Sequence, residues 1–285
     1  MTAELTLIDI PHDVFNYLLF PLLDKLSIFY LELIVQRKKI PSILQFPDSI
    51  HELIIKEGFD HYIWFEKYNC LDHTKSMIYA AKYGQIKILE YGRLNDFTFK
   101  NKIMNTAAQY GKLDCIKLLN RYGLDFSEQT ISASASGNQV EIISYLFSRH
   151  CKIDEEAYKS ACRNGSLECL VYMIKHSKLP LNQEYYDIAL NYGHINILKY
   201  IDSITFIFHP SFFEKVIKYD HREILRYFLT FKWYNSTMYS TACKYNNLAV
   251  LQILWETGVD LNHHIKCECL EKDNIPEIKE WLKTH

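Results

Sequence analysis

Glycine and proline are scarce in this sequence. Only 9 Gly and 7 Pro occur among 285 residues, too few for the many tight turns of a β-sandwich or β-barrel. Apolar residues make up 48% of the chain and charged residues 23%, a balance that excludes disorder and provides ample material for a core. We therefore expect an all-α protein.

A surplus of charge of either sign is also lacking. The 32 basic residues nearly balance 34 acidic ones, and only 7 of the basic residues are Arg. Proteins that bind nucleic acid usually present a clustered basic surface. The sequence therefore favours no nucleic-acid partner.

Long apolar runs are missing too. A membrane-spanning helix needs about 18 or more uninterrupted apolar residues, and even the stretch from Ile28 to Val35 contains Glu32. The first residues do not resemble a signal peptide, since no basic region precedes an apolar one. The eight cysteines are spread over the chain rather than arranged as a small secreted framework. We expect a cytoplasmic or nuclear monomer that does not contact membranes.

One phrase of the sequence recurs about every 27 residues. It reads Ala80-Ala81-Lys-Tyr-Gly84 at its first clear occurrence and Ala107-Ala108-Gln-Tyr-Gly111 at the next. The positions equivalent to the glycine, which we call anchors, are Gly84, Gly111, Asn138, Gly165, Gly193, Asp220 and Asn246. Asn and Asp are the residues other than Gly that best tolerate a left-handed backbone. We expect each anchor to form a turn that ends a helix.

Other columns of the repeat describe a pair of helices around each anchor. Small residues precede it by three and four positions, as at Ala80 and Ala81, where one helix must approach the next closely. Apolar residues follow it at plus 2, plus 4 or 5 and plus 8, which is helical periodicity. A tyrosine column at plus 7 is predicted to pack between second helices. The expected N-caps of first helices are Ser127, Asp154, Asn182 and Ser211. Each unit therefore reads as loop, first helix, turn and second helix.

Weaker copies flank the seven clear units. Gly58 fits a degenerate first anchor and Asp273 a last one, and terminal units of a stack are usually atypical because one side faces water. The repeats are thus expected to span residues 47–285, behind a separate segment of residues 1–46.

The repeated phrase, followed by Gly123-Leu-Asp125 and Gly258-Val-Asp260, resembles the ankyrin repeat. The resemblance implies an ankyrin-like α-solenoid that binds other proteins. The period is shorter than the usual value of about 33 and the Thr-Pro-Leu-His signature is lacking, so the β-hairpin fingers should be shortened or absent. Such short repeats are similar to those of ankyrin proteins of large DNA viruses of amoebae, which implies a viral protein of the host cytoplasm.

The first 46 residues resemble an F-box. The residues that match its core are Ile10, Pro11, Asp13, Val14, Leu18, Leu19 and Leu22. That resemblance implies that Ile10, Pro11, Val14, Leu18, Leu19 and Leu22 dock on the Skp-type adaptor of a cullin-RING ubiquitin ligase. The later part of the F-box pattern is absent, and the alternative is a helical cap for the first repeat. Exposed side chains at Leu18, Leu19 and Leu22 would indicate docking, whereas buried ones would indicate a cap.

No catalytic or metal-binding motif emerges. The sequence contains neither a phosphate-binding glycine loop nor a nucleophile elbow, and its glycines are explained as anchors. His263, His264, Cys267 and Cys269 lie close together, but the Cys-x-Cys spacing is tight for zinc and a second pair is missing. We predict a protein that is not an enzyme and that holds no metal or cofactor.

The two residues before each anchor, which we call the doublet, are the predicted partner-binding site. Tyr fills the second place in five of the seven doublets. In ankyrin proteins these positions lie on the concave face, and Tyr and basic side chains are frequent at binding hot spots. The alternative is a structural ladder in which each Tyr packs on its neighbour. The predicted binding residues are Lys82, Tyr83, Gln109, Tyr110, Arg163, Asn164, Asn191, Tyr192, Lys218, Tyr219, Lys244 and Tyr245.

Overall fold

The structure is a computed structural model that describes residues 48–67, 71–177, 179–205, 209, 211–232, 234, 237–261 and 276–284. These residues form helices, turns and loops, and no strand occurs among them, which confirms the all-α prediction for this part of the chain. Residues 1–46, with the six predicted adaptor-docking residues, lie outside the described residues. So do His263, His264, Cys267, Cys269 and the anchor predicted at Asp273.

The chain divides into two compact units, residues 1–130 and 131–285. The helices of the first unit are α3 (Asp48–Glu57), α4 (Phe59–Glu66), α5 (His73–Tyr83), α6 (Ile86–Leu94), α7 (Asn101–Gln109) and α8 (Leu113–Arg121). The boundary falls within α9 (Glu128–Ser136). The second unit holds α10 (Val140–Ser148), α11 (Glu155–Asn164), α12 (Leu167–His176), α13 (Gln183–Asn191), α14 (Ile195–Ile204), α15 (Ser211–Lys218), α16 (Arg222–Thr230), α17 (Thr237–Lys244), α18 (Leu248–Glu256) and α20 (Pro276–Thr284).

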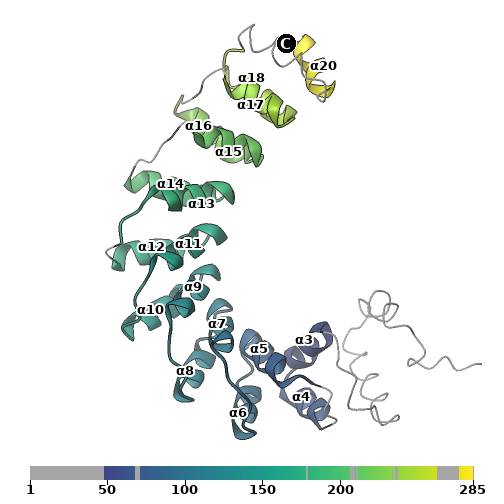
Figure 1. The fold of residues 1–285 in the computed structure, drawn as a ribbon, viewed down its shortest axis with the longest axis vertical. Helices are drawn as coiled ribbons and strands as arrows, with labels where there is room; N and C mark the ends of the chain where they lie inside the picture. The colour runs from purple at the N-terminus through teal and green to yellow at the C-terminus, as the bar shows by residue number, and fades with distance from the viewer. Residues whose placement is uncertain are drawn as a thin grey trace, which may run out of the picture. The chain divides into compact units, whose positions relative to one another are not determined.

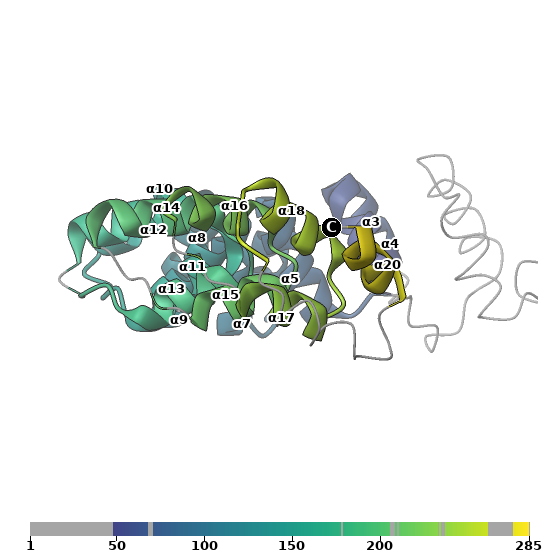
Figure 2. The same ribbon diagram turned by 90° about the horizontal axis from the view of Figure 1, so that it is seen from above.

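Within each unit the helices follow one another in pairs (Figure 1). In the first unit α5 packs between α3 and α7, and α6 packs between α4 and α8. In the second unit α11, α13, α15 and α17 form one layer, and α10, α12, α14, α16 and α18 form the other (Figure 2). Successive first helices are therefore in contact from α3 to α7 in the first unit and from α11 to α17 in the second, which brings their doublets next to one another.

All seven anchors adopt the left-handed backbone conformation that the sequence predicts. Their φ angles are 76° at Gly84, 74° at Gly111, 55° at Asn138, 75° at Gly165, 80° at Gly193, 57° at Asp220 and 51° at Asn246. The residue after each anchor donates its N–H to the carbonyl four residues before the anchor, as His194 does to Ala189. This bond satisfies a helix-terminal carbonyl, so each anchor ends its first helix in the expected way.

The core columns are filled as predicted. Ala80, Ala81, Ala107 and Ala108 are fully buried at the close approach of first helices. The apolar stripe of each second helix is also buried, as at Cys169, Leu170 and Met173. Larger residues occupy the small columns before two of the later anchors, where Leu190, Val216 and Ile217 are buried. Helical periodicity thus identified the core, but it did not fix the size of each side chain.

Helix caps confirm two of the four predicted N-caps. The carboxylate of Asp154 accepts the N–H of Ala157, and the amide oxygen of Asn182 accepts the N–H of Tyr185. The Ser211 prediction is wrong, because Ser211 is the first residue of α15 and its N–H is accepted by the ring of His209. The fourth predicted N-cap, Ser127, directly precedes α9, and its hydroxyl lies 3.2 Å from the hydroxyl of Thr130.

The cysteines in the core are mostly small apolar side chains. Cys115, Cys162 and Cys169 are buried free thiols, and burial raises the pKa of each to about 12. Such thiols are poor nucleophiles at neutral pH. Cys243 is likewise buried, and it is disulfide-bonded.

A half-buried carboxylate joins α13, α14 and α16. Asp202 accepts hydrogen bonds from Tyr186 at 3.1 Å and from Tyr227 at 3.0 Å. Burial raises the pKa of Asp202 more than these two bonds lower it. The plus-7 tyrosine prediction is confirmed at Tyr227, which ties its own second helix to the preceding one.

Replacing Asp202 by asparagine is expected to stabilise the protein at neutral pH. The amide oxygen can still accept both tyrosine hydroxyls, and the cost of burying a charge disappears. The folded protein binds the proton of the Asp202 carboxyl more tightly than the unfolded chain does. The ionised carboxylate therefore lowers the free energy of unfolding at a pH above its raised pKa. Below the pKa of the unfolded chain, near 4, the group is protonated in both states and this cost is absent. Urea unfolding should show a gain on the order of 0.5 kcal/mol at pH 7 that vanishes towards pH 3.5. A gain that persists in acid would contradict this explanation.

Candidate functional site

The five tyrosines of the doublets occur in two states. Tyr83 and Tyr245 are half-buried, and each donates to a glutamate of the preceding helix pair. Tyr110, Tyr192 and Tyr219 are 44%, 55% and 46% exposed. Hydrogen bonds to glutamates therefore hold two of the five tyrosines, and the other three are accessible to a partner.

A glutamate holds the doublet at each end of the described repeats. Glu52 of α3 accepts from the ammonium of Lys82 and the hydroxyl of Tyr83. These bonds lower the pKa of Glu52, with Lys82 the larger cause. In the second unit Glu214 accepts from Lys244 and Tyr245, each at 3.0 Å. Lys82, Tyr83, Lys244 and Tyr245 thus contribute to stacking between helix pairs.

Each Lys-Tyr doublet is preceded by a unit in which the residue six positions before the anchor is acidic. Glu52, Asp187 and Glu214 occupy this position before Lys82, Lys218 and Lys244. Asp187 is one methylene shorter, and it pairs with Lys215 at 2.6 Å. Lys218 instead lies over the ring of Tyr219, 5.1 Å from its centroid. The doublet Lys218-Tyr219 is therefore left at the surface.

The other predicted binding residues lie at first-helix ends without such a glutamate. Gln109 and Tyr110 are exposed, and Lys82 lies 5.2 Å from the Tyr110 ring centroid. In the second unit Arg163 pairs weakly with Glu156 at 3.4 Å, and Asn164 donates to the carbonyl of its own helix. Asn191 and Tyr192 are exposed. We call Arg163, Asn164, Asn191, Tyr192, Lys218 and Tyr219 the doublet surface.

Most other charges on the first helices of the second unit are paired across neighbouring helices. Lys159 of α11 contacts Glu184 of α13 at 2.8 Å, and Lys215 of α15 contacts Asp187 of α13. Lys244 of α17 contacts Glu214 of α15. Exposed pairs of this kind contribute little to stability, because solvent and salt screen the attraction between the two charges. Because these charges are paired with one another, the doublet surface presents mainly tyrosine and amide groups to a partner.

Sequence reasoning missed a second structural column, the residue directly after each anchor. The His194 ring contacts the Arg163 carbonyl at 2.9 Å, and the His221 ring contacts the Asn191 carbonyl at 3.1 Å. Asn247 donates to the Ile217 carbonyl at 3.3 Å. Each bond joins one helix pair to the preceding one and satisfies a carbonyl at a first-helix end. The column reads Gln85, Lys112, Gln139, Ser166, His194, His221 and Asn247, so its uniform polarity was the available signal.

The anchor residue and the residue after the next anchor are complementary in size. A β-carbon at Gly165 would lie 2.6 Å from the His194 ring, and one at Gly193 would lie 2.8 Å from the His221 ring. The anchor Asn138 is instead matched with the small Ser166 of the next pair, and Asn138 bonds to Glu168. Glycine is therefore needed at Gly165 and Gly193 for space as well as for backbone conformation.

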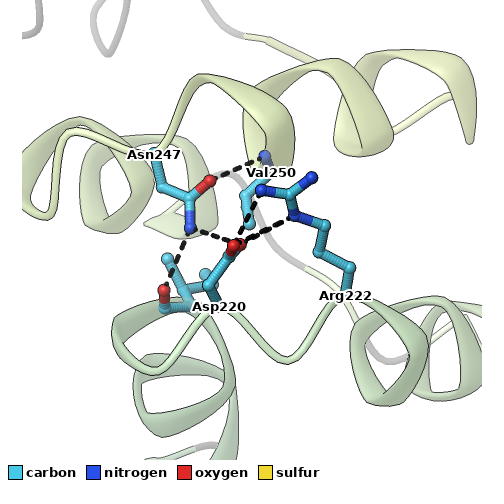
Figure 3. Close-up of polar contacts among 5 residues, drawn as sticks. Asp220, Arg222, Asn247 and Val250 are labelled. Carbon is cyan, nitrogen blue, oxygen red and sulfur yellow. Dashed lines mark hydrogen bonds and ion pairs between the residues drawn. The ribbon is translucent and has the colours of Figure 1, made fainter. Parts of the chain in front are cut away.

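Asp220 forms the most extensive of these junctions (Figure 3). Its carboxylate accepts from the Arg222 guanidinium at 2.7 to 3.1 Å and from the Asn247 amide at 2.9 Å. Asn247 also accepts the N–H of Val250 and so caps α18. The Arg222 bonds, and to a lesser extent the Asn247 bond, hold the pKa of Asp220 below its ordinary value. Asp220 therefore orders its own turn together with the start of α18, the second helix of the next pair.

The described residues offer no metal centre, because no three His, Cys, Asp or Glu side chains in these ranges gather closely enough to hold an ion. None of the described helices is long and apolar enough to cross a membrane. Comparison with protein-family models finds no match to this chain, and comparison with curated proteins finds no relative. Any functional proposal for this chain therefore depends on its own residues and their geometry.

Proposed function

We propose that this chain is a non-enzymatic protein-binding module with an ankyrin-like α-solenoid fold. What supports the fold is the recurrence of helix pairs around seven left-handed anchors spaced by about 27 residues. Stacked repeats of this kind present extended surfaces and usually serve in binding. The proposed compartment is the cytoplasm or nucleus, of a host cell if the protein is viral.

One observation carries the binding proposal. Tyr192 and Tyr219 are about half exposed, whereas two other tyrosines at the same position of the repeat are hydrogen-bonded to glutamates. Exposed tyrosines next to basic and amide side chains offer large contact area at low entropic cost, as binding hot spots do. The doublet surface is therefore the proposed contact site for a protein partner.

The N-terminal segment extends the proposal to a ubiquitin ligase. In this reading, residues 1–46 dock a Skp-type adaptor through Ile10, Pro11, Val14, Leu18, Leu19 and Leu22, and the doublet surface selects the substrate. What supports it is the F-box resemblance alone. The alternative is a plain scaffold or inhibitor in which residues 1–46 cap the first repeat.

A pull-down from eukaryotic cell extract with three forms of the full chain separates these readings. We expect Tyr192→Ala/Tyr219→Ala to lose the specific partners, because each exposed hot-spot tyrosine contributes about 2 kcal/mol to binding. The variant Pro11→Ala/Leu18→Ala/Leu19→Ala should keep those partners and lose the adaptor and cullin, read by mass spectrometry.

Two controls make the result decisive. Tyr245→Phe removes one hydroxyl from the column and leaves the doublet surface intact, so it should retain all partners. Circular dichroism must show that every variant is folded. Partners that survive the Tyr192/Tyr219 change would contradict the doublet surface, and an adaptor missing from the intact chain would leave the scaffold reading.

A further inference from the structure

A cluster of aromatic and basic side chains lies at the ends of two neighbouring second helices, away from the doublets. Phe147 at the end of α10 contacts the ring of His176 at the end of α12, with centroids 5.9 Å apart. His176 lies 4.3 Å from the ring of Tyr172. Arg149, which follows α10, lies over the Tyr145 ring at 5.4 Å from its centroid. We call these residues, with Lys152 and Lys175, the α10–α12 cluster.

The cluster is exposed and lacks paired acids. Arg149, Lys152, Lys175 and His176 are all exposed, and Phe147 is 37% exposed. The nearest acidic residue in sequence, Asp154, is engaged as the N-cap of α11. Among the described residues Arg149, Lys152 and Lys175 form no ion pair, whereas the first helices of the same unit pair most of their charges.

Helix electrostatics explains only part of this arrangement. Basic residues are favoured in the last turn of a helix, where they offset the negative end of the helix dipole. Glu141 and Glu168, in the first turns of α10 and α12, complete that pattern. The dipole does not account for an exposed phenylalanine packed against a histidine, with Arg149 and Lys175 within two residues of these rings in the sequence. Basic groups around an accessible aromatic surface are a composition typical of binding sites.

We propose that the α10–α12 cluster is a second interaction surface, which binds an acidic segment of a protein partner. Carboxylates of the segment pair with Arg149 and Lys175, and an apolar side chain of the segment packs on Phe147 and His176. The charge complementarity carries this assignment, because three cations without a carboxylate partner attract acidic residues and repel basic ones.

A protein segment fits better than a nucleic-acid strand. Three unpaired cations match a few carboxylates, but a strand that carries a phosphate at each nucleotide would run along α10 and α12 towards Glu141 and Glu168. The chain as a whole also has a net charge of −2.

The test selects displayed random peptides on the full chain and measures the affinity of the strongest binders by fluorescence polarisation. We expect the selected peptides to be enriched in Asp and Glu next to apolar residues. Their affinity should fall about tenfold in Arg149→Gln/Lys175→Gln and should weaken as salt is raised. The control Lys199→Gln/Arg226→Gln makes the same change of charge at exposed residues of α14 and α16, and it should bind as the unchanged chain does.

The alternatives give different results. Peptides without acidic enrichment, or acidic peptides whose affinity is unchanged in Arg149→Gln/Lys175→Gln, would overturn the proposal. Loss of binding in Tyr192→Ala/Tyr219→Ala instead would assign the peptides to the doublet surface, which overturns the second site and leaves the proposed function intact. A single-stranded oligothymidine probe that binds the chain and is lost in the Gln variant would assign the cluster to nucleic acid and would also overturn it.

Discussion

Replacing Gly165 by alanine is expected to lower the free energy of unfolding by about 3 kcal/mol. A non-glycine residue in the left-handed conformation costs about 1–2 kcal/mol. The new methyl group would also displace the His194 ring, whose bond to the Arg163 carbonyl contributes about 1 kcal/mol. Urea unfolding followed by circular dichroism measures the change through the transition midpoint.

A double variant distinguishes the two contributions. His194→Ser removes the ring and reproduces the small residue found opposite Asn138, so it should cost less in the Gly165→Ala background than in the unchanged chain. The expected coupling is on the order of 1 kcal/mol. Strictly additive effects would show that Gly165 and His194 do not compete for space. Gly123→Ala serves as the control, because this glycine also has a positive φ but no atom lies within 4 Å of its added β-carbon.

Asp220→Ala is expected to cost about 2 kcal/mol at neutral pH. The change removes the bonds from Arg222 and Asn247 and places alanine in the left-handed conformation. Asp220→Gly removes the same bonds without the backbone strain, so it should cost only about 1 kcal/mol. Equal losses in the two variants would contradict a role for backbone conformation at this anchor.

The contribution of Asp220 should also depend on pH. Because the pKa of Asp220 is lowered in the folded protein, the unfolded chain takes up the proton first as the pH falls. The stabilisation is therefore complete above the unfolded value near 4 and is lost as the pH falls through the folded pKa. The difference between the unchanged chain and Asp220→Gly should narrow below about pH 4, and a constant difference would show that the charge is not involved.

The repeat and its turns could be predicted from the sequence because each depends on local chemistry. Asn138, Asp220 and Asn246 share with glycine a tolerance of positive φ, so the anchor column was recognisable despite substitution. Helical periodicity likewise located the buried stripe of each second helix.

The division of the tyrosine column could not be predicted in the same way. Whether Tyr83 or Tyr192 is tied down depends on a glutamate about 30 residues earlier in the chain, and on which helices lie side by side. The α10–α12 cluster also arises from the packing of two helices, since Phe147 and His176 are far apart in sequence. Contacts of this kind emerge only when the pairs are stacked.

The matching of anchors with the following pair restricts how this protein could gain or lose units during evolution. Loss of residues 166–193 would set Gly165 against His221, which repeats the glycine and histidine combination already present at Gly193. Loss of residues 139–165 would set Asn138 against His194, where the asparagine β-carbon would meet an imidazole ring. Units of nearly equal length are therefore not interchangeable, and a duplication or deletion survives only where its new neighbours fit.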